Sequence, residues 1–456
     1  MRRILSLLAL VLPLTLIGQT KSLLWEITGN GLTKPSYLYG TMHVSDKIAF
    51  HLTDSFFIAL KSADVIALES NPEHWIENDF GNPDKSGNYS YNESSYYNNR
   101  LFSYSEKDFY SDVSAVFVPD DEVYLSAYGD DSWLVNGYLY RYNDREGDYA
   151  EETYLDLFIF QCGKKLNKKI AALEKEQEVL KLLQEAYNEP EDNEKEEEAD
   201  FIEKKRIRQA FEDEDESVYE MIDEAYRDGD LERLDSLEIL VTPSSRYHQY
   251  FIVDRNKNMV RRMDSIMQQG KIIFTGIGAA HLPGNQGAIN LLREMGYTVR
   301  PVQGKVSNKS IKEKEKIDAM IYAQSTRKQY ATDSLFSVVS PGKLYVINDY
   351  KSNTYMLYPD MANSAYYSVL RIAHHAHMEG KTPDEVLAGL EKMFYEYIPG
   401  DIQSQTAIKT NNGWPGYDIV SKTKRGFYQR YRIIVSPLET IIFKGSGIGT
   451  FVTKSK

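Results

Sequence analysis

The sequence predicts an α/β core, in which a pseudo-symmetric sheet flanked by helices carries an inserted cap, and a C-terminal α+β domain with an antiparallel sheet. Up to Val302, strand-like runs alternate with helical patterns, and two of the runs stop at glycine before the same Gly-x-x-His spacing. Beyond residue 331, alternating strands and turn residues dominate. The 456 residues are enough for at least two domains.

Two strands are expected at the start of the core, Leu23–Thr28 and Ser36–Tyr39, because aromatic and β-branched residues flank a turn rich in glycine. Their short connection predicts antiparallel pairing. Residues 52–63 carry apolar side chains at helical spacing, and Asp64–Glu69 follows as a buried strand. This order is typical of a β-α-β unit, in which polar residues at the strand ends bind ligands.

The middle of the core region is less regular. Residues 71–148 are rich in Asn, Tyr, Asp, Ser and Gly, and we interpret them as an insertion that is either a cap over the core or a variable surface loop. Helical patterns return over residues 151–186, around a short strand that ends at Glu174. Residues 188–235 are strongly acidic and helix-forming, which is typical of solvated helix faces.

The second half of the core repeats the first. A helix over Tyr247–Gln269 leads to a strand over Lys271–Ile277, and a second Gly-x-x-His turn follows. A helix over Ala288–Met295 and a strand over Tyr297–Val302 complete the unit. Because strand, histidine turn, helix and strand recur in this order, the core is expected to be internally pseudo-symmetric. We assign residues 19–305 to this domain and residues 306–330 to a linker.

Residues 331–456 are expected to form the α+β domain. Helices are predicted over Ala362–Gly380 and Pro383–Tyr395. The first would place His374 and His377 on one face, but no acidic or cysteine partner lies at ligand spacing, which favours ordinary exposed histidines. The predicted strands are residues 336–343, 344–347, 354–358, 417–420, 429–435, 440–443 and 449–452.

The net charge and the cysteine content of the chain limit the classes of function that it can have. A net charge of −14 argues against binding to nucleic acid or to an anionic membrane, since both need a dense basic face. The only cysteine, Cys162, permits no internal disulfide and is interpreted as a buried small hydrophobe.

Arg2 and Arg3 before a short apolar run predict a signal peptide over residues 1–18, with an uncleaved anchor as the alternative. The mature chain is expected in the periplasm, associated with the envelope or secreted, without stable membrane insertion.

His43 and His281, the histidines of the two Gly-x-x-His turns, are the first candidates for chemistry. An imidazole just after a strand end can point into a cleft, and it is a common ligand for Mn, Co, Zn or Fe. With Glu69 they would form a three-ligand metal site with room for water, which a divalent ion acidifies. Gly-x-x-His also occurs by chance, so the pairing of the two turns carries this prediction.

Six segments occur in order between Leu23 and Val302: Leu24–Ile27, Tyr37–Ser45, Ala67–Glu69, Lys169–Gln177, Arg255–Asn256 and Gly278–Gly284. This ordered set resembles the TraB/GumN family. That family is related to the Tiki metalloproteases and, more distantly, to the erythromycin esterase-like and ChaN-like proteins. The resemblance implies an α/β core with both histidine motifs and acidic residues at one site, and, for the Tiki branch, metal-dependent peptide cleavage.

The resemblance also implies roles for individual residues. His43 and His281 match the motif histidines and would bind metal or act as bases, while Glu69 would complete the ligand set or polarise water. Glu174 matches the Leu-Glu position and would orient a group or accept a proton. Arg255 matches the arginine of the Arg-Asn pair and would stabilise an oxyanion or bind a substrate carboxylate. A structural ion pair between Arg255 and Glu174 is the alternative.

We therefore predict an exported, divalent-metal-dependent hydrolase of peptide or protein substrates. The alternative is a non-catalytic module of the cell envelope that binds or sequesters a peptide or signal. The presence of both histidines together with Glu69 and Glu174 favours the enzyme. The oligomeric state stays open.

Overall fold

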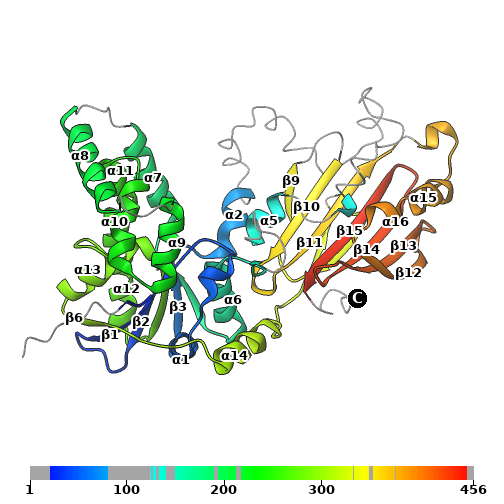
Figure 1. Ribbon diagram of the computed structural model, residues 1–456. Helices are drawn as coiled ribbons and strands as arrows, with labels where there is room; N and C mark the ends of the chain where they lie inside the picture. Colours follow the sequence, from blue (N-terminus) through cyan, green and yellow to red (C-terminus); the bar gives the residue numbers. More distant parts are fainter. Residues whose placement is uncertain are drawn as a thin grey trace, which may run out of the picture.

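The computed structural model describes residues 21–80, 124, 127–129, 133–139, 149–188, 194–211, 217–331, 333–348, 353–374 and 376–448. An α/β core and a C-terminal antiparallel sheet lie side by side (Figure 1), which confirms the predicted combination of fold classes. The predicted signal peptide and most of the predicted 71–148 insertion lie outside the described residues. No helix among the described residues is long and apolar enough to cross a membrane.

The core sheet has six strands in the order β4-β3-β5-β2-β1-β6. The four strands β4, β3, β5 and β2 run parallel, and β1 is antiparallel to both of its neighbours. The predicted antiparallel pairing of the first two strands is confirmed, with Leu24 opposite Tyr39. The strands are β1 (Leu24–Gly29), β2 (Ser36–Thr41), β3 (Val65–Leu68), β4 (Lys169–Ala172), β5 (Ile273–Gly278) and β6 (Tyr297–Pro301).

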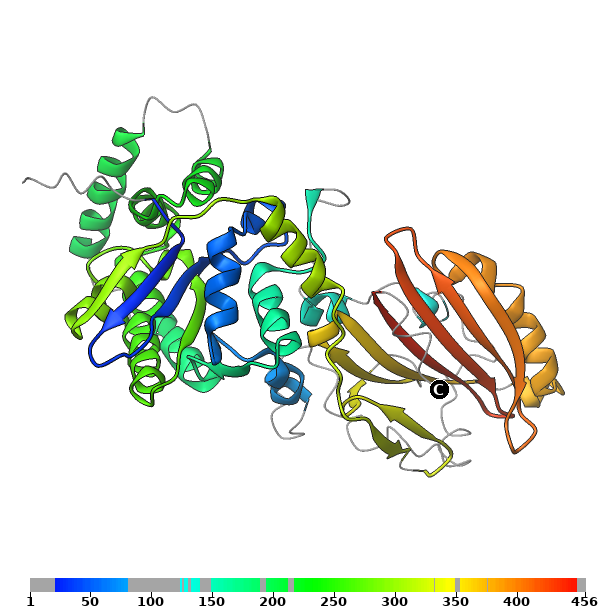
Figure 2. The same ribbon diagram turned by 90° about the horizontal axis from the view of Figure 1, so that it is seen from below.

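Helices cover both faces of this sheet. The crossovers through α1 (Asp54–Ser62) and α6 (Leu155–Lys165) lie on one face, and α12 (Arg255–Gln268) and α13 (Ala288–Glu294) lie on the other (Figure 2). The chain therefore leaves the adjacent strands β2 and β5 towards opposite faces. Such a switch in direction opens a crevice at the carboxyl ends of the two strands, where α/β sheets bind ligands.

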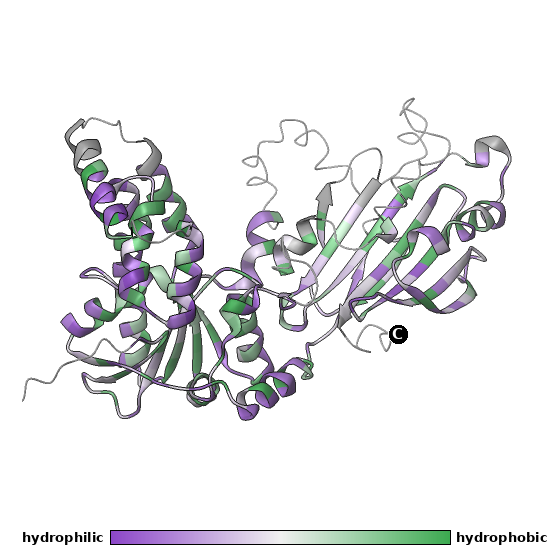
Figure 3. Cartoon of the chain, in the orientation of Figure 1, coloured by the Kyte–Doolittle hydropathy of each residue, from purple (hydrophilic) through white to green (hydrophobic). Residues whose placement is uncertain are grey.

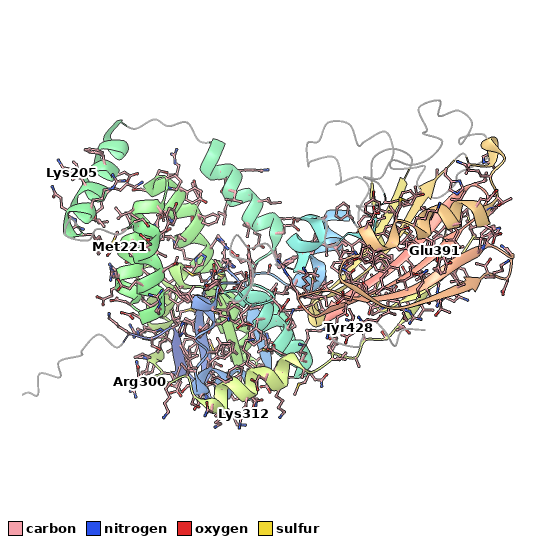
Figure 4. All side chains as sticks on the ribbon, turned by 45° about the vertical axis from the view of Figure 1, so that its right-hand side comes forward. Lys205, Met221, Arg300, Lys312, Glu391 and Tyr428 are labelled. Atoms are coloured by element: carbon pink, nitrogen blue, oxygen red, sulfur yellow. The ribbon has the colours of Figure 1, made fainter. Side chains whose placement is uncertain are left out.

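The acidic segment is helical, as predicted. It forms α8 (Glu194–Ala210), α9 (Val218–Asp228) and the start of α10 (Leu231–Val241), while α7 (Glu176–Asn188) belongs to the preceding stretch that was also predicted to be helical. Lys205 on α8 is exposed at the outer edge, whereas Met221 on α9 is buried (Figure 4). Ser217 begins α9 with a capping box, and Gly229 ends it in a left-handed conformation with φ of 68°. The helices α9 and α10 bury apolar residues such as Met221 and Leu237, whereas Leu180 of α7 and Phe201 of α8 stay exposed.

The helix predicted over Tyr247–Gln269 is divided. It consists of α11 (Ser245–His248), a six-residue π-helical turn η5 (Gln249–Asp254) and α12. The π-helical turn ends directly before Arg255 and Asn256, which are both buried against the core. Single π turns inside helices occur frequently at functional sites.

The C-terminal domain is built on a seven-stranded antiparallel sheet, as predicted in outline. Its strand order is β12-β13-β14-β15-β11-β10-β9, with α15 (Pro383–Glu391) and α16 (Phe394–Tyr397) beside it. A separate hairpin joins β7 (Arg327–Tyr330) to β8 (Ser337–Ser340). The sheet strands are β9 (Tyr345–Asn348), β10 (Asn353–Asp360), β11 (Ala365–Ala373), β12 (Asp401–Lys409), β13 (Pro415–Lys422), β14 (Phe427–Val435) and β15 (Glu439–Ile448).

The helix predicted over Ala362–Gly380 is wrong. The middle of this segment, Ala365–Ala373, is β11, a strand between β10 and β15. Because most of its residues on both faces are buried, its apolar residues do not alternate with polar ones as those of a half-exposed strand do. His374 follows the strand and His377 lies in a short 3-10 helix, so they share no helix face. His375 lies outside the described residues.

The hydrophobic cluster of the α/β core extends into the C-terminal domain, which also has two clusters outside it. Residues of α6 pack in the same cluster as Tyr345, Leu357 and Met361 of the C-terminal domain. The buried Gln161 amide of α6 donates hydrogen bonds to Met361 O at 2.9 Å and to Ser364 Oγ at 2.8 Å. The helices α2 (Trp75–Phe80) and α5 (Trp133–Leu139) lie between the two sheets (Figure 1). The central strands are mostly hydrophobic, and the outer helices show hydrophilic faces (Figure 3).

Candidate active site

The five predicted site residues come together at one edge of the core sheet. His43 follows β2, Glu69 follows β3, Glu174 follows β4 and His281 follows β5, all at the carboxyl ends of parallel strands. Arg255 reaches the same edge from the first turn of α12. The two histidines thus meet where the chain leaves β2 and β5 in opposite directions.

His43 is held from behind by a carboxylate. Its Nδ1 lies 2.8 Å from Asp156 Oδ2, and Asp156 is fixed in turn because Thr41 Oγ1 donates a hydrogen bond to its Oδ1 at 2.6 Å. The Asp156 carboxylate raises the pKa of His43 to about 9, although burial acts in the opposite direction. The side chain of His43 is 53% exposed, so its Nε2 is accessible from solvent.

His281 is held by a neutral amide instead. Its Nδ1 lies 2.8 Å from Asn256 Oδ1, and the Asn256 amide nitrogen donates to the carbonyl oxygen of Gln286 at 2.9 Å. Since a carbonyl only accepts, the amide of Asn256 must turn its oxygen towards His281, and Nδ1 carries the proton. The lone pair of His281 then lies on Nε2. Burial lowers the pKa of His281 to about 4, which keeps the ring neutral.

Glu69 lies between the two imidazoles. Its Oε1 is 3.9 Å from Nε2 of His43 and 3.9 Å from Nε2 of His281. The same oxygen accepts a hydrogen bond from the N–H of Gly278 at 2.7 Å. Burial alone would raise the pKa of Glu69, but the neighbouring imidazoles, Arg255 and this N–H outweigh it and lower the pKa to about 2. Glu69 is therefore ionised at neutral pH.

Arg255 joins the two glutamates. Its guanidinium donates to Glu69 Oε2 at 2.7 Å and to both carboxylate oxygens of Glu174 at 2.8 and 2.7 Å. Arg255 is only 7% exposed, and its remaining nitrogen donates to Phe251 O at 3.3 Å. The guanidinium is thus occupied by protein acceptors in this arrangement. This geometry matches the predicted alternative, a structural ion pair, more closely than a free oxyanion donor.

An open cleft of about 1050 Å³ contains His43, Glu69, Glu174 and Arg255. Gly278 borders the same group, and a Cβ at this position would lie 3.4 Å from Glu69 Oε1 and 3.8 Å from His43 Nε2. A side chain here would fill the space between the carboxylate and the imidazole. Glycine therefore keeps this space open for a ligand.

Comparison with protein families matches residues 23–301, more than half of the chain, to the TraB/PrgY/gumN family. The chain belongs to this family. The family resemblance of the sequence motifs is thereby confirmed, and the matched region coincides with the α/β core and ends at β6. No curated protein matches the chain significantly. In this TraB/PrgY/gumN chain, the seven-stranded sheet lies wholly beyond the matched region.

Two residues that contact the histidines of this TraB/PrgY/gumN candidate site are missing from the predicted site residues. Asp156 lies in the first turn of α6, where an acidic residue ordinarily complements the helix dipole. Asn256 enters the sequence prediction only as the neighbour of Arg255 in the Arg-Asn pair. The available signal for Asp156 was its place at the start of an apolar helix directly before a parallel strand, since the beginning of such a helix can lie beside the site edge.

The donor chemistry at this edge suits a divalent cation. Both histidines present Nε2, because Asp156 and Asn256 hold the other nitrogen, a common arrangement behind metal ligands. Three carboxylates outnumber the single guanidinium by two charges. However, no group of three or more His, Cys, Asp or Glu side chains in the described part of the chain is arranged to hold an ion as it stands. The 3.9 Å separations exceed the roughly 3.4 Å expected between two donors of one tetrahedral ion.

Proposed function

We propose that this protein is an exported, divalent-metal-dependent hydrolase of peptide-like bonds. His43, His281 and Glu69 would hold the ion, and the identity of the metal (Mn, Co, Zn or Fe) is part of the question for experiment. The observation that carries the proposal is the position of Glu69 Oε1, 3.9 Å from the Nε2 atoms of both histidines. Glu69 and His43 line the open cleft, and His281 is buried directly behind them. Binding requires these three side chains to draw slightly closer together.

Hydrolysis adds water across the scissile bond: the water oxygen bonds to the carbonyl carbon, the C–N bond breaks, and the amine takes a proton. A divalent ion supplies Lewis acidity that makes water a nucleophile at neutral pH. Glu69, with its lowered pKa, stays ionised and would serve as a metal ligand rather than as a general acid or base. His43 is open to solvent, so bulk water can deliver the proton that the amine needs.

We assign Arg255 and Glu174 to positioning. The Arg255 guanidinium fixes the Oε2 atom of Glu69 and leaves Oε1 directed towards the imidazoles. Glu174 holds the guanidinium of Arg255 in place through two hydrogen bonds. The pair thereby holds the ligand carboxylate in one orientation.

Two finer features belong to the same proposal. The two Gly-x-x-His units follow adjacent parallel strands, which supports an internally pseudo-symmetric core whose two halves each supply one histidine. We further propose that the segment over residues 71–148 caps the cleft. Its described parts include Asn71, Trp75, Asp79 and Gly137, all of which line the cleft.

The proposal that the protein is exported rests on the basic and apolar pattern of residues 1–18. An export assay of a reporter fused after residue 25 tests it, with Arg2→Glu/Arg3→Glu as the weakened variant. Appearance of a processed reporter outside the cytoplasm supports the assignment. Retention of the reporter inside the cell contradicts it.

The function itself is tested by measuring bound metals in the purified mature chain and its cleavage of a peptide library with and without chelator. We expect cleavage that chelator abolishes and that one of the four metals restores. The His43→Ala/His281→Ala variant should lose both metal and cleavage. Tight peptide binding without cleavage under any metal would favour the non-catalytic alternative, a module that sequesters a peptide or signal.

A further inference from the structure

One wall of the cleft carries three partly or largely exposed apolar side chains, of which only Trp75 also packs against a core cluster. We call Trp75, Val179 and Leu180 the apolar wall; all three line the cleft together with the site residues. Leu180 is 49% exposed, and Trp75 and Val179 are half-buried. Among the described residues, Val179 and Leu180 belong to none of the three hydrophobic core clusters. Their apolar surface therefore faces the cleft rather than the core.

The apolar wall is joined to the site by short connections. Glu69 ends β3, and Trp75 begins α2 six positions later. Glu174 precedes α7, and Leu180 lies six positions beyond it. Six residues span at most about 20 Å, and the helical turns within both connections shorten this distance. An extended peptide at the site needs only a few residues to reach the wall.

The rest of the cleft has groups that suit a peptide backbone. Asn78 and Gln177 are exposed in the cleft beside the apolar wall. Their neutral amides both donate and accept hydrogen bonds, as the N–H and C=O groups of an extended peptide require. The Trp75 ring is fixed because its Nε1 donates to Ser70 Oγ at 3.0 Å. A partly exposed aromatic ring in a fixed orientation gives a flat contact surface for an apolar side chain.

We propose that the apolar wall is a specificity subsite that binds a large aliphatic or aromatic side chain of an extended peptide, within three residues of the bond that is cleaved. This inference rests on the proposed function, because the substrate is taken to be a peptide. A pocket of this kind distinguishes leucine or phenylalanine from alanine by about tenfold or more. Charged residues at the same substrate position would bind more weakly than alanine.

The test uses end-blocked, fluorescent hexapeptides of glycine and serine with one variable residue: leucine, phenylalanine, alanine or aspartate. Binding is measured by anisotropy to the chelator-treated full chain, and cleavage is measured separately after metal is added. The variant is Val179→Ser/Leu180→Ser. The matched control is Ile202→Ser on α8, which is 57% exposed and does not line the cleft.

Leucine and phenylalanine peptides should bind at least about tenfold more tightly than alanine peptides to the wild type and the control. The Val179→Ser/Leu180→Ser variant should lose this preference while its circular dichroism stays unchanged. If the wild type prefers leucine and phenylalanine peptides in binding but cleaves none of them, the subsite is supported and the proposed hydrolase function is contradicted. Equal binding of all peptides by the wild type overturns the subsite. The subsite is also overturned if the wild type is a dimer and the Val179→Ser/Leu180→Ser variant is a monomer, because a second copy of the chain would then cover the apolar wall.

Discussion

The Nδ1 atom of His43 lies 2.8 Å from Oδ2 of Asp156, although the two residues are 113 positions apart. This contact orients the imidazole so that Nε2 faces Glu69. We expect Asp156→Asn to weaken metal binding and peptide hydrolysis by about 10- to 100-fold, the usual effect of losing the residue behind a ligand histidine. Isothermal titration with metal and initial rates on the best peptide measure it.

The control for this variant is Asp318→Asn, which removes a carboxylate paired with Lys314 at a distance from the cleft. It should keep wild-type metal affinity and rate. Equal metal affinity in Asp156→Asn and Asp318→Asn would show that Asp156 does not position the ligand.

Metal affinity should rise with pH because one group of the site, His43, must lose a proton before it can bind the ion. Asp156 raises the pKa of His43 to about 9, so this ring is protonated at neutral pH and must lose its proton before Nε2 can bind an ion. His281 and Glu69 have pKa values lowered to about 4 and about 2 and are already deprotonated. The dissociation constant should fall about tenfold per pH unit from roughly pH 6 to pH 9, then level off. A constant value across that range would exclude His43 as a ligand.

Asn256 should matter for both stability and metal binding. Asn256→Leu leaves the buried Nδ1–H of His281 without its acceptor, which costs about 1–3 kcal/mol in the free energy of unfolding. The ring is then free to change tautomer, so metal affinity should fall as well. Urea denaturation and metal titration report the two effects. Asn258→Leu, on the same helix, is the matched control, and similar losses in both variants would refute a specific role for Asn256.

Arg255→Met separates the positioning role of Arg255 from an oxyanion role. It leaves the partly buried Glu69 and Glu174 without their shared partner, so the free energy of unfolding should fall by up to about 3–5 kcal/mol. The exposed Arg261→Met should cost less than about 0.5 kcal/mol. If Arg255→Met retained full stability and lost only cleavage, the guanidinium would act on the substrate instead.

The core and its histidine pair were predictable because their signals are local. Strands that end at glycine before His43 and His281 are visible in sequence, and parallel pairing brings their ends together. The acidic residues after β3 and β4 follow from the same rule. The family resemblance supplied the grouping of Glu174 and Arg255 with the histidines.

The remaining features depend on tertiary contacts that leave little local trace. Asp156 reaches His43 across 113 positions, so no spacing rule connects them. The strand β11 was mistaken for a helix because most of it is buried on both faces, which removes the alternation of a half-exposed strand. The edge strand β12 was missed because most of its residues are polar and exposed. The π-helical turn directly before Arg255 has no counterpart in the helical periodicity of the sequence.

A crystal structure of the chain soaked with manganese or zinc tests the central claim most directly. Anomalous scattering should show one ion within about 2.0–2.3 Å of His43 Nε2, His281 Nε2 and a carboxylate oxygen of Glu69. The peak should disappear in crystals of the His43→Ala/His281→Ala variant. An ion bound elsewhere in the chain, or histidines that remain 3.9 Å from Glu69 with no ion between them while the protein cleaves peptides, would contradict the account.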